Sequence, residues 1–167
     1  MEKLKEIIEK LGWKIDDISF GDGEVGWDLQ QYSPAGEDFY FSICHNNDVK
    51  KAISEISEYA ENFDEEEHIE MWIEAKHHHN VRDIPSAKVL VQDAEDIANM
   101  LMELSNYLLG NVRVCGECGK IMQEGYVIEG GLQYYCSDEC LHKHYTKEEW
   151  EEMYTDDGDN YWTSWEE

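Results

Sequence analysis

Two closely spaced cysteine pairs constrain this chain more than any other feature of its sequence. Two residues separate Cys115 from Cys118, three separate Cys136 from Cys140, and seventeen lie between the pairs. Zn²⁺ prefers four soft ligands in a tetrahedron, and a short C-x₂-C turn supplies two sulfurs from one loop without backbone strain. The spacing therefore predicts one structural zinc ion held by four thiolates.

The segment between the pairs is long enough for a β-hairpin that returns the chain to the metal. Residues 127–128 and 134–135 suit its two strands. The turns would be made by Gly125, Gly130 and Gly131. Ser137 is a suitable N-cap, which would place Cys140 in the first turn of a helix, where free N–H groups favour a thiolate. Loop, hairpin and helix in this order form a treble-clef arrangement.

These residues resemble a known group of zinc modules. The order Cys115-Gly-Glu-Cys118-Gly-Lys120, followed by Tyr135-Cys136-Ser137-Asp138-Glu139-Cys140-Leu141, is similar to treble-clef modules of the TRASH, MYM and YHS type, whose pattern ends in an aromatic-Cys-Ser-x-x-Cys step. The resemblance covers residues 112–145 and implies a structural zinc but no activity. His142 and His144 follow the last cysteine and are alternative ligands, although four cysteines already complete the shell.

The chain is strongly acidic. Its 39 acidic and 13 basic residues give a formal net charge of −26, and four zinc-bound thiolates would add about two further negative charges. The acidity is spread, with 25 acidic and 9 basic residues up to Gly110 and 14 and 4 after it. We therefore expect the protein to repel nucleic acid and anionic membranes, because no basic patch is segregated for binding them.

Composition nevertheless indicates a folded protein in a reducing compartment. Hydrophobic residues make up 41% of the chain, with six Trp and ten Tyr, whereas acidic disordered tails lack such aromatics. No apolar run approaches the length of a membrane span, and charges occur throughout the first turns, which predicts a cytoplasmic location. Four of five cysteines stand at metal-binding spacing, which fits reduced thiols. Cys44, the fifth, is expected to be a buried thiol.

Hydrophobic periodicity predicts an α+β fold, in which amphipathic helices pack on a small antiparallel sheet that is followed by the zinc module. Alternation and turn residues predict strands within 14–20, 24–29 and 39–44. Helical spacing predicts helices within 4–11, 49–63, 64–74 and 86–110. Gly12 should end the first helix by taking a positive φ, and Asn47 or Asp48 should cap the second. The predicted domains are an acidic α+β domain at 1–110, a zinc module at 111–146, and an acidic aromatic helix and tail at 147–167.

The helix predicted at 86–110 has the strongest periodicity. Its apolar residues alternate spacings of four and three, and they are Leu90, Ala94, Ile97, Leu101, Leu104 and Leu108. Such a seam is typical of a helix packed in the core of its own chain, and it could also form a homodimer.

The C-terminal segment combines acidic and aromatic side chains. Thr146-Lys147-Glu148-Glu149 is a capping box, which predicts a helix through Trp150 and Met153. Beyond it, two arrangements stay open: the tryptophans fold back onto the zinc module, or aromatic anchors ringed by negative charge face a basic groove. The candidate partner-binding residues are Glu148, Glu149, Glu151, Glu152, Asp156, Asp157, Asp159, Trp162 and Trp165. The three aspartates lack the rest of a calcium-binding EF-hand loop.

No catalytic motif stands out. The chain has no glycine-rich phosphate loop, no H-E-x-x-H and no G-x-S-x-G. His77, His78 and His79 are consecutive, and neighbours on a backbone point in different directions, which favours a solvent loop over a metal site. Cys44 and His45 are adjacent in a predicted strand, so they would face opposite sides of the sheet rather than form a dyad. These observations predict a protein that is not an enzyme.

The leading hypothesis is a binding protein that occupies the basic, nucleic-acid-binding surface of a partner by imitating phosphate charge. In size, charge and lack of a catalytic signature the chain resembles phage and mobile-element anti-restriction and anti-CRISPR inhibitors, which implies a bacterial defence nuclease as the target. Stretches that look like uncharacterised acidic phage and mobile-element proteins are Trp27-Asp28, 32–38 and Tyr161-Trp162-Thr163. The alternatives are a zinc-containing adaptor whose acidity only maintains solubility, and a metal-dependent hydrolase that uses His77 to His79 or acidic clusters with Mg²⁺.

Overall fold

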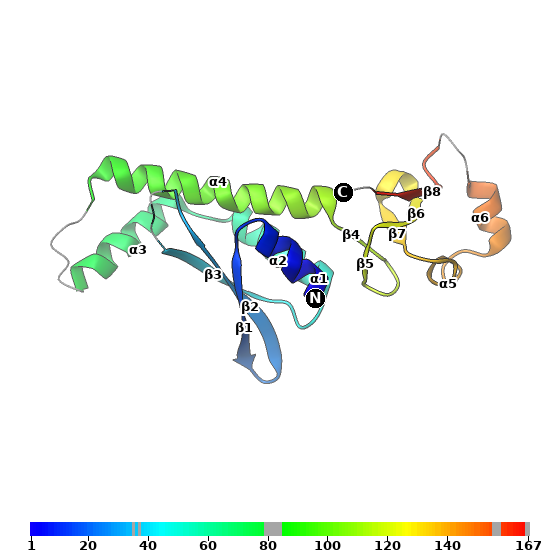
Figure 1. Cartoon of the computed structure of the whole chain (residues 1–167), viewed down its shortest axis with the longest axis horizontal. Helices are drawn as coiled ribbons and strands as arrows, with labels where there is room; N and C mark the ends of the chain where they lie inside the picture. Colours follow the sequence, from blue (N-terminus) through cyan, green and yellow to red (C-terminus); the bar gives the residue numbers. More distant parts are fainter. Residues whose placement is uncertain (35, 37, 79–84, 155–157, 166–167) are drawn as a thin grey trace.

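A computed structural model of the protein describes residues 1–34, 36, 38–78, 85–154 and 158–165. The fold is α+β, as predicted, and it is elongated (Figure 1). Helix α4 (Ala87–Asn111) runs along much of its length. A three-stranded sheet and three further helices lie alongside α4, and the cysteine-rich segment lies beyond its C-terminal end. No helix in this described part of the chain combines the length and the apolar character needed to cross a bilayer.

The first sheet is an antiparallel meander of β1 (Lys14–Gly21), β2 (Glu24–Tyr32) and β3 (Asp38–Cys44), in that order. Ile15, Leu29 and Phe41 stand in one row of the ladder, and all are buried on the face that packs against helices. Gly26 allows close packing, because a Cβ there would lie 1.9 Å from the carbonyl oxygen of Ile43. The three predicted strands are confirmed.

The helices follow the predicted pattern closely. Their bounds are α1 (Glu2–Lys10), α2 (Val49–Glu61), α3 (Glu65–His78) and α4. Gly12 takes a φ of +94° just after α1. Asp48, rather than Asn47, caps α2, because its carboxylate accepts the backbone N–H groups of Lys50 and Lys51. Helix α3 extends past the predicted end at residue 74.

All six seam residues of α4 are buried in the structure of the single chain. Four of them, Ile97, Leu101, Leu104 and Leu108, belong to the main hydrophobic core together with residues of α1, α2 and all three strands. The seam therefore serves the core, and a homodimer would need a different surface.

The second half contains smaller elements around the cysteines. They are β4 (Arg113–Val114), β5 (Ile121–Met122), β6 (Glu124–Ile128), the 3₁₀ turn η1 (Glu129–Gly131), β7 (Gln133–Tyr135), α5 (Asp138–Leu141), α6 (Lys147–Met153) and β8 (Tyr161–Ser164). Strands β6 and β7 form the predicted hairpin. Strand β8, which sequence periodicity did not predict, pairs with the other edge of β6. Gly125 lies inside β6 rather than at a turn.

The chain passes from one hydrophobic core to a second between two consecutive residues. Val114 packs in the main core, and Cys115 is fully buried in a second core around the cysteines. Helix α4 continues to Asn111, one residue past the predicted boundary at Gly110. Tail residues Trp150 and Trp165 pack against the second core, so the predicted third segment is packed on the cysteine-rich module.

Candidate metal centre

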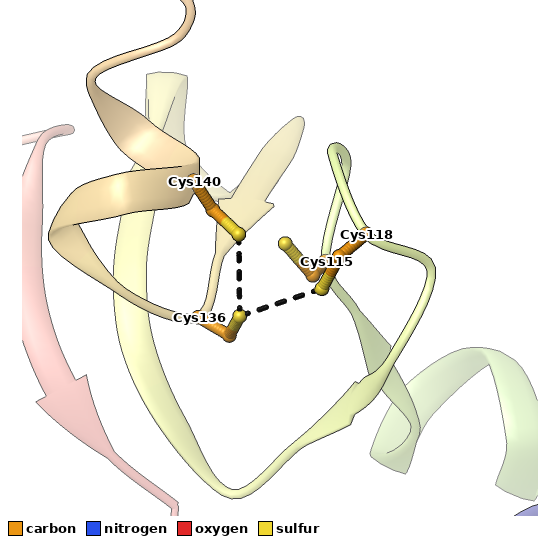
Figure 2. A group of neighbouring side chains, drawn as sticks. All are labelled: Cys115, Cys118, Cys136 and Cys140. Atoms are coloured by element: carbon orange, nitrogen blue, oxygen red, sulfur yellow. Dashed lines mark hydrogen bonds between the residues drawn. The ribbon is translucent and has the colours of Figure 1, made fainter.

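The four cysteines come together from two segments of the chain (Figure 2). Cys115 and Cys118 lie in the loop between β4 and β5, Cys136 follows β7, and Cys140 lies in α5. Their sulfur atoms all lie within 4.8 Å of one another. The Cys118–Cys136 and Cys136–Cys140 sulfur pairs, joined by dashed lines in Figure 2, are 3.6 and 3.7 Å apart.

These separations can be tested against the geometry of a metal–thiolate site. In a regular tetrahedron with Zn–S bonds of about 2.3 Å, sulfur atoms are about 3.8 Å apart. A disulfide needs only about 2.05 Å, and all the cysteines are free. The cluster therefore fits four ligands that converge on one metal ion.

Backbone hydrogen bonds shape the first cysteine loop. The N–H of Cys115 donates to the carbonyl oxygen of Lys120 at 2.9 Å, and the N–H of Gly119 donates to the carbonyl oxygen of Cys115 at 3.1 Å. Gly119 has a φ of +69°, a conformation that glycine adopts without a Cβ penalty. The N–H of Gly116 donates to Tyr134 at 2.7 Å. This last bond fixes the loop on β7, the strand that leads to Cys136.

The second pair is positioned by helix α5. Ser137 is its N-cap, as predicted, and the Ser137 hydroxyl accepts the backbone N–H of Cys140 at 3.4 Å. The hydroxyl of Tyr126 donates to the carboxylate of Asp138, which ties α5 to β6. These contacts therefore fix Cys140, in the first turn of α5, close to Cys136, which directly precedes the N-cap.

The thiols differ in their acidity. Burial raises the pKa of Cys115, but backbone N–H groups of Cys118, Cys136 and Glu117 oppose it and lower this pKa to about 6. Burial and the neighbouring sulfurs raise the pKa of Cys136 to about 12, and burial raises that of Cys140. Four thiolates this close repel one another, so full deprotonation requires a cation between them, as in metal sites.

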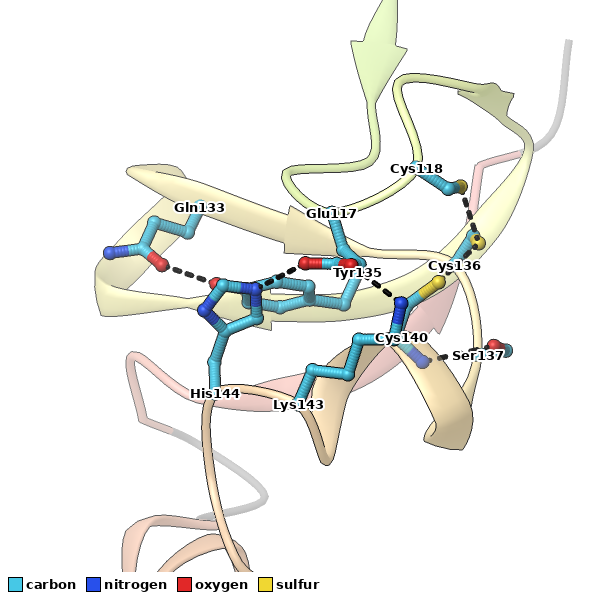
Figure 3. Close-up of polar contacts among 9 residues, drawn as sticks. All are labelled: Glu117, Cys118, Gln133, Tyr135, Cys136, Ser137, Cys140, Lys143 and His144. Carbon is cyan, nitrogen blue, oxygen red and sulfur yellow. Dashed lines mark hydrogen bonds and ion pairs between the residues drawn. The ribbon is translucent and has the colours of Figure 1, made fainter.

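Both histidines after the last cysteine have partners other than the sulfurs, as Figure 3 shows for His144. His142 Nδ1 lies 3.0 Å from the carbonyl oxygen of Tyr145, and His144 Nε2 lies 2.8 Å from a carboxylate oxygen of Glu117. The other oxygen of Glu117 accepts from Lys143 Nζ at 2.6 Å. This group, which sequence analysis missed, ties the first cysteine loop to the segment after α5, because Glu117 and Lys143 are 26 residues apart.

The C-terminal tryptophans fold back onto the module, one of the two arrangements left open. The Trp165 ring lies 5.7 Å from that of Tyr134, and the Trp162 ring 4.6 Å from that of Tyr126. Trp162 nevertheless stays 44% exposed.

Most of the predicted partner-binding acids lie on the surface. Exposed members within the described residues are Glu148, Glu149, Glu151, Glu152 and Asp159. Asp156 and Asp157 lie outside the described residues. Their role in binding a partner stays a prediction.

Sequence analysis also singled out the run from His77 to His79 and Cys44. His77 and His78 lie at the end of helix α3 rather than in a loop, and the side chains of all three histidines lie outside the described residues. Cys44 is half-buried rather than buried, with Sγ 3.6 Å from Lys51 Nζ. In the part of the chain that the structure describes, the cysteine cluster is the one group with metal-ligand geometry.

The chain matches no family model, no curated protein and no solved structure with which it was compared.

Proposed function

We propose that the four cysteines bind a single structural zinc ion. Four thiolates complete a tetrahedral shell and leave no open position for substrate, which is typical of structural rather than catalytic zinc. The donor set and the sulfur separations support this assignment. Native mass spectrometry of the purified protein should give one zinc per chain. A second tightly bound metal would instead favour the hydrolase alternative.

We further propose that the protein is not an enzyme, and that it is a cytoplasmic inhibitor that occupies the basic nucleic-acid-binding surface of a partner. The observation that carries this proposal is uncompensated negative charge. Among the described residues, lysine–carboxylate ion pairs are limited to Lys5–Asp17, Lys14–Asp16 and Lys143–Glu117. With 39 acidic and only 13 basic residues in the chain, at least two thirds of the acidic side chains cannot have a lysine or arginine partner of their own. A surface of this kind favours association with a cationic groove.

Helix α6 is the candidate contact surface. Its four glutamates, Glu148, Glu149, Glu151 and Glu152, are exposed and fixed on a rigid element. Aromatic packing holds this helix against β6, since the rings of Trp150 and Tyr126 pack edge-on with their centroids 5.0 Å apart. Carboxylates held in a fixed array can replace phosphates in a basic channel and displace the same counter-ions, which makes binding depend steeply on salt. A bacterial defence nuclease, such as a restriction enzyme or a CRISPR effector, is the partner class we favour.

The test is a set of DNA-cleavage assays with purified restriction enzymes and CRISPR effectors. We expect the protein to inhibit at least one nuclease in competition with DNA, with weaker inhibition at higher salt. Reversing Glu148, Glu151 and Glu152 to Lys should abolish inhibition, while Glu149 is kept because it caps the helix. The matched control reverses three exposed glutamates of α1, namely Glu2, Glu6 and Glu9.

Two results would contradict this proposal. If both triple variants lose inhibition equally, net charge rather than the α6 surface is responsible. If the protein inhibits no nuclease and its partners elute without regard to salt, the adaptor alternative gains support.

A further inference from the structure

A basic cavity lies where the two cores meet. It has a volume of about 430 Å³, and α1, the C-terminal end of α4 and the β4–β5 hairpin enclose it. Its lining includes three basic side chains, Lys3, Lys10 and Arg113, and no acidic residue within the described part of the chain. In a protein with a net charge of −26, such a local concentration of positive charge is unexpected from composition.

Arg113 is held in place, and one of its nitrogen atoms is buried without a hydrogen-bond partner in the described residues. Its Nη1 donates to the carbonyl oxygen of Gly110 at 2.5 Å, and its guanidinium lies 5.7 and 5.9 Å from the rings of Tyr134 and Trp165. Its Nε is buried and finds no partner among the described residues. An unsatisfied buried donor is costly, so a small side-chain movement that let an anion reach this solvent-inaccessible nitrogen would be favoured.

The two lysines are also available. Within the described residues, neither Lys3 nor Lys10 forms an ion pair with a carboxylate, unlike Lys5 on the same helix, which pairs with Asp17 at 3.0 Å. Lysine acts as a mobile point charge, whereas arginine supplies a fixed, planar fork of donors. Together they can neutralise a dianion better than a single negative charge.

Apart from two polar side chains, Asn111 and Gln123, the remaining walls are apolar and partly aromatic. Ile7, Leu11, Val112 and Ile121 line the cavity, together with Trp165. Such a wall favours the binding of a flat apolar group, because both the group and the wall then lose contact with water. The cavity therefore combines a place for an anion with a place for a planar body.

We propose that this cavity binds a small phosphate ester with a flat apolar body, of the size of a nucleoside monophosphate. The net charge of the protein does not prevent this, because at physiological salt charges are screened beyond about 8 Å. Glu6 lies one helical turn from both lysines but does not line the cavity, so a small anion there responds mainly to the three lining cations. A long nucleic acid would meet the acidic surface around them. The ligand would contact elements of both cores and thereby fix their relative position. This inference does not depend on the proposed inhibition of a nuclease.

The test is isothermal titration calorimetry of the zinc-loaded full chain in phosphate-free buffer. The probes are AMP and UMP, with adenosine and inorganic phosphate as partial ligands. We expect at least one nucleotide to bind, and both adenosine and phosphate to bind at least about tenfold more weakly. The double variant Lys3→Glu/Lys10→Glu should weaken nucleotide binding by about tenfold or more. The matched control Lys50→Glu/Lys88→Glu changes the net charge by the same amount at positions outside the cavity. It should bind the nucleotides like the unaltered protein.

Several outcomes would overturn the proposal. One is no binding of AMP or UMP up to about 5 mM, a concentration above the millimolar dissociation constants of weak ligands. Adenosine or phosphate that binds as tightly as the nucleotides would show that the combined site does not exist. Equal affinities of the two double variants would place the binding outside the cavity. Far-UV and near-UV circular dichroism of each variant verifies that a loss of binding is not a loss of fold.

Discussion

The two cores of this protein differ in what can hold them together. Among the described residues, the main core buries nineteen hydrophobic side chains, which come from α1, α2, α4, the first sheet and β4, together with Trp13 between α1 and β1. The second buries five, and one of these is the ligand candidate Cys115. A small core rarely offsets the entropy of its chain without a metal or a cross-link. From this comparison we predict that apolar burial folds the first half, whereas the cysteine-rich half needs a bound metal ion.

The largest expected effect is the loss of the second core when a ligand is removed. We predict that Cys136→Ser unfolds the cysteine-rich module, because structural zinc contributes on the order of 10 kcal/mol to folding. Hydrogen exchange measured by NMR should show loss of amide protection in β6 and β7 and retained protection in β2 and β3. Cys44→Ser, which alters the cysteine outside the cluster, is the control. Unchanged protection of β6 after chelation of the metal would contradict the comparison.

A cavity introduced into the main core should destabilise the first half of the protein and leave the cysteine-rich module intact. Leu101 on α4 is fully buried, and Leu101→Ala should lower the free energy of unfolding by about 2–5 kcal/mol. Urea unfolding followed by hydrogen exchange should show the loss in β2, β3 and α2, with the zinc content unchanged. Met102→Ala, at a side chain 39% exposed on the same helix, should cost less than about 0.5 kcal/mol. Equal loss of protection in β6 would show that the two cores unfold together.

Acid should weaken the main core by a smaller amount and for a reason unrelated to the metal. Burial lowers the pKa of His45 and His68, while nearby Asp17 and Asp93 respectively oppose it. A lowered pKa means that the unfolded chain binds the proton more readily, so this stability is complete above the ordinary pKa of 6.5 and is lost as pH falls through the folded pKa.

Urea midpoints of the main core between pH 8 and pH 5 measure this effect. His68→Phe should make the midpoints less dependent on pH, since the His68 ring already packs against Phe39 and Phe63. A variant with the same pH dependence as the unaltered protein would show that His68 contributes nothing to it.

Sequence predicted the features that local rules determine. The seam of α4, the capping box at Thr146 and the N-cap at Ser137 are short-range patterns, and all three occur as predicted. Strand β8 was missed because it has four residues and exists only through pairing with distant β6. The contact of Glu117 with Lys143 was missed because these two residues are 26 positions apart and no local pattern relates them.

The sulfur cluster was predictable because the spacing of metal-binding cysteines in a sequence indicates which residues come together around one ion. The basic cavity has no such signature. Lys3, Lys10 and Arg113 are far apart along the chain, and only the packing of α1 beside the end of α4 brings them to one cavity.

The smallest expected effect concerns the cap of α6, and it separates packing from metal binding within the second core. The Thr146 hydroxyl accepts the N–H of Glu149 at 3.2 Å, and the Glu149 carboxylate accepts the N–H of Thr146 at 2.7 Å. This second hydrogen bond lowers the pKa of Glu149. Thr146→Ala should destabilise α6 by about 1 kcal/mol. Thr146→Ser keeps the capping hydroxyl and should therefore retain most of the stability of α6.

Hydrogen exchange of α6 amides and the zinc content of the same samples measure the two contributions separately. If the metal dominates the second core, Thr146→Ala loosens α6 and leaves zinc fully bound, because the cap is not connected to a cysteine through any hydrogen bond in the described residues. Loss of zinc from this variant would mean that α6 and the metal loop fold as one cooperative unit. The second core would then resemble the first, with packing rather than the ion as its main support.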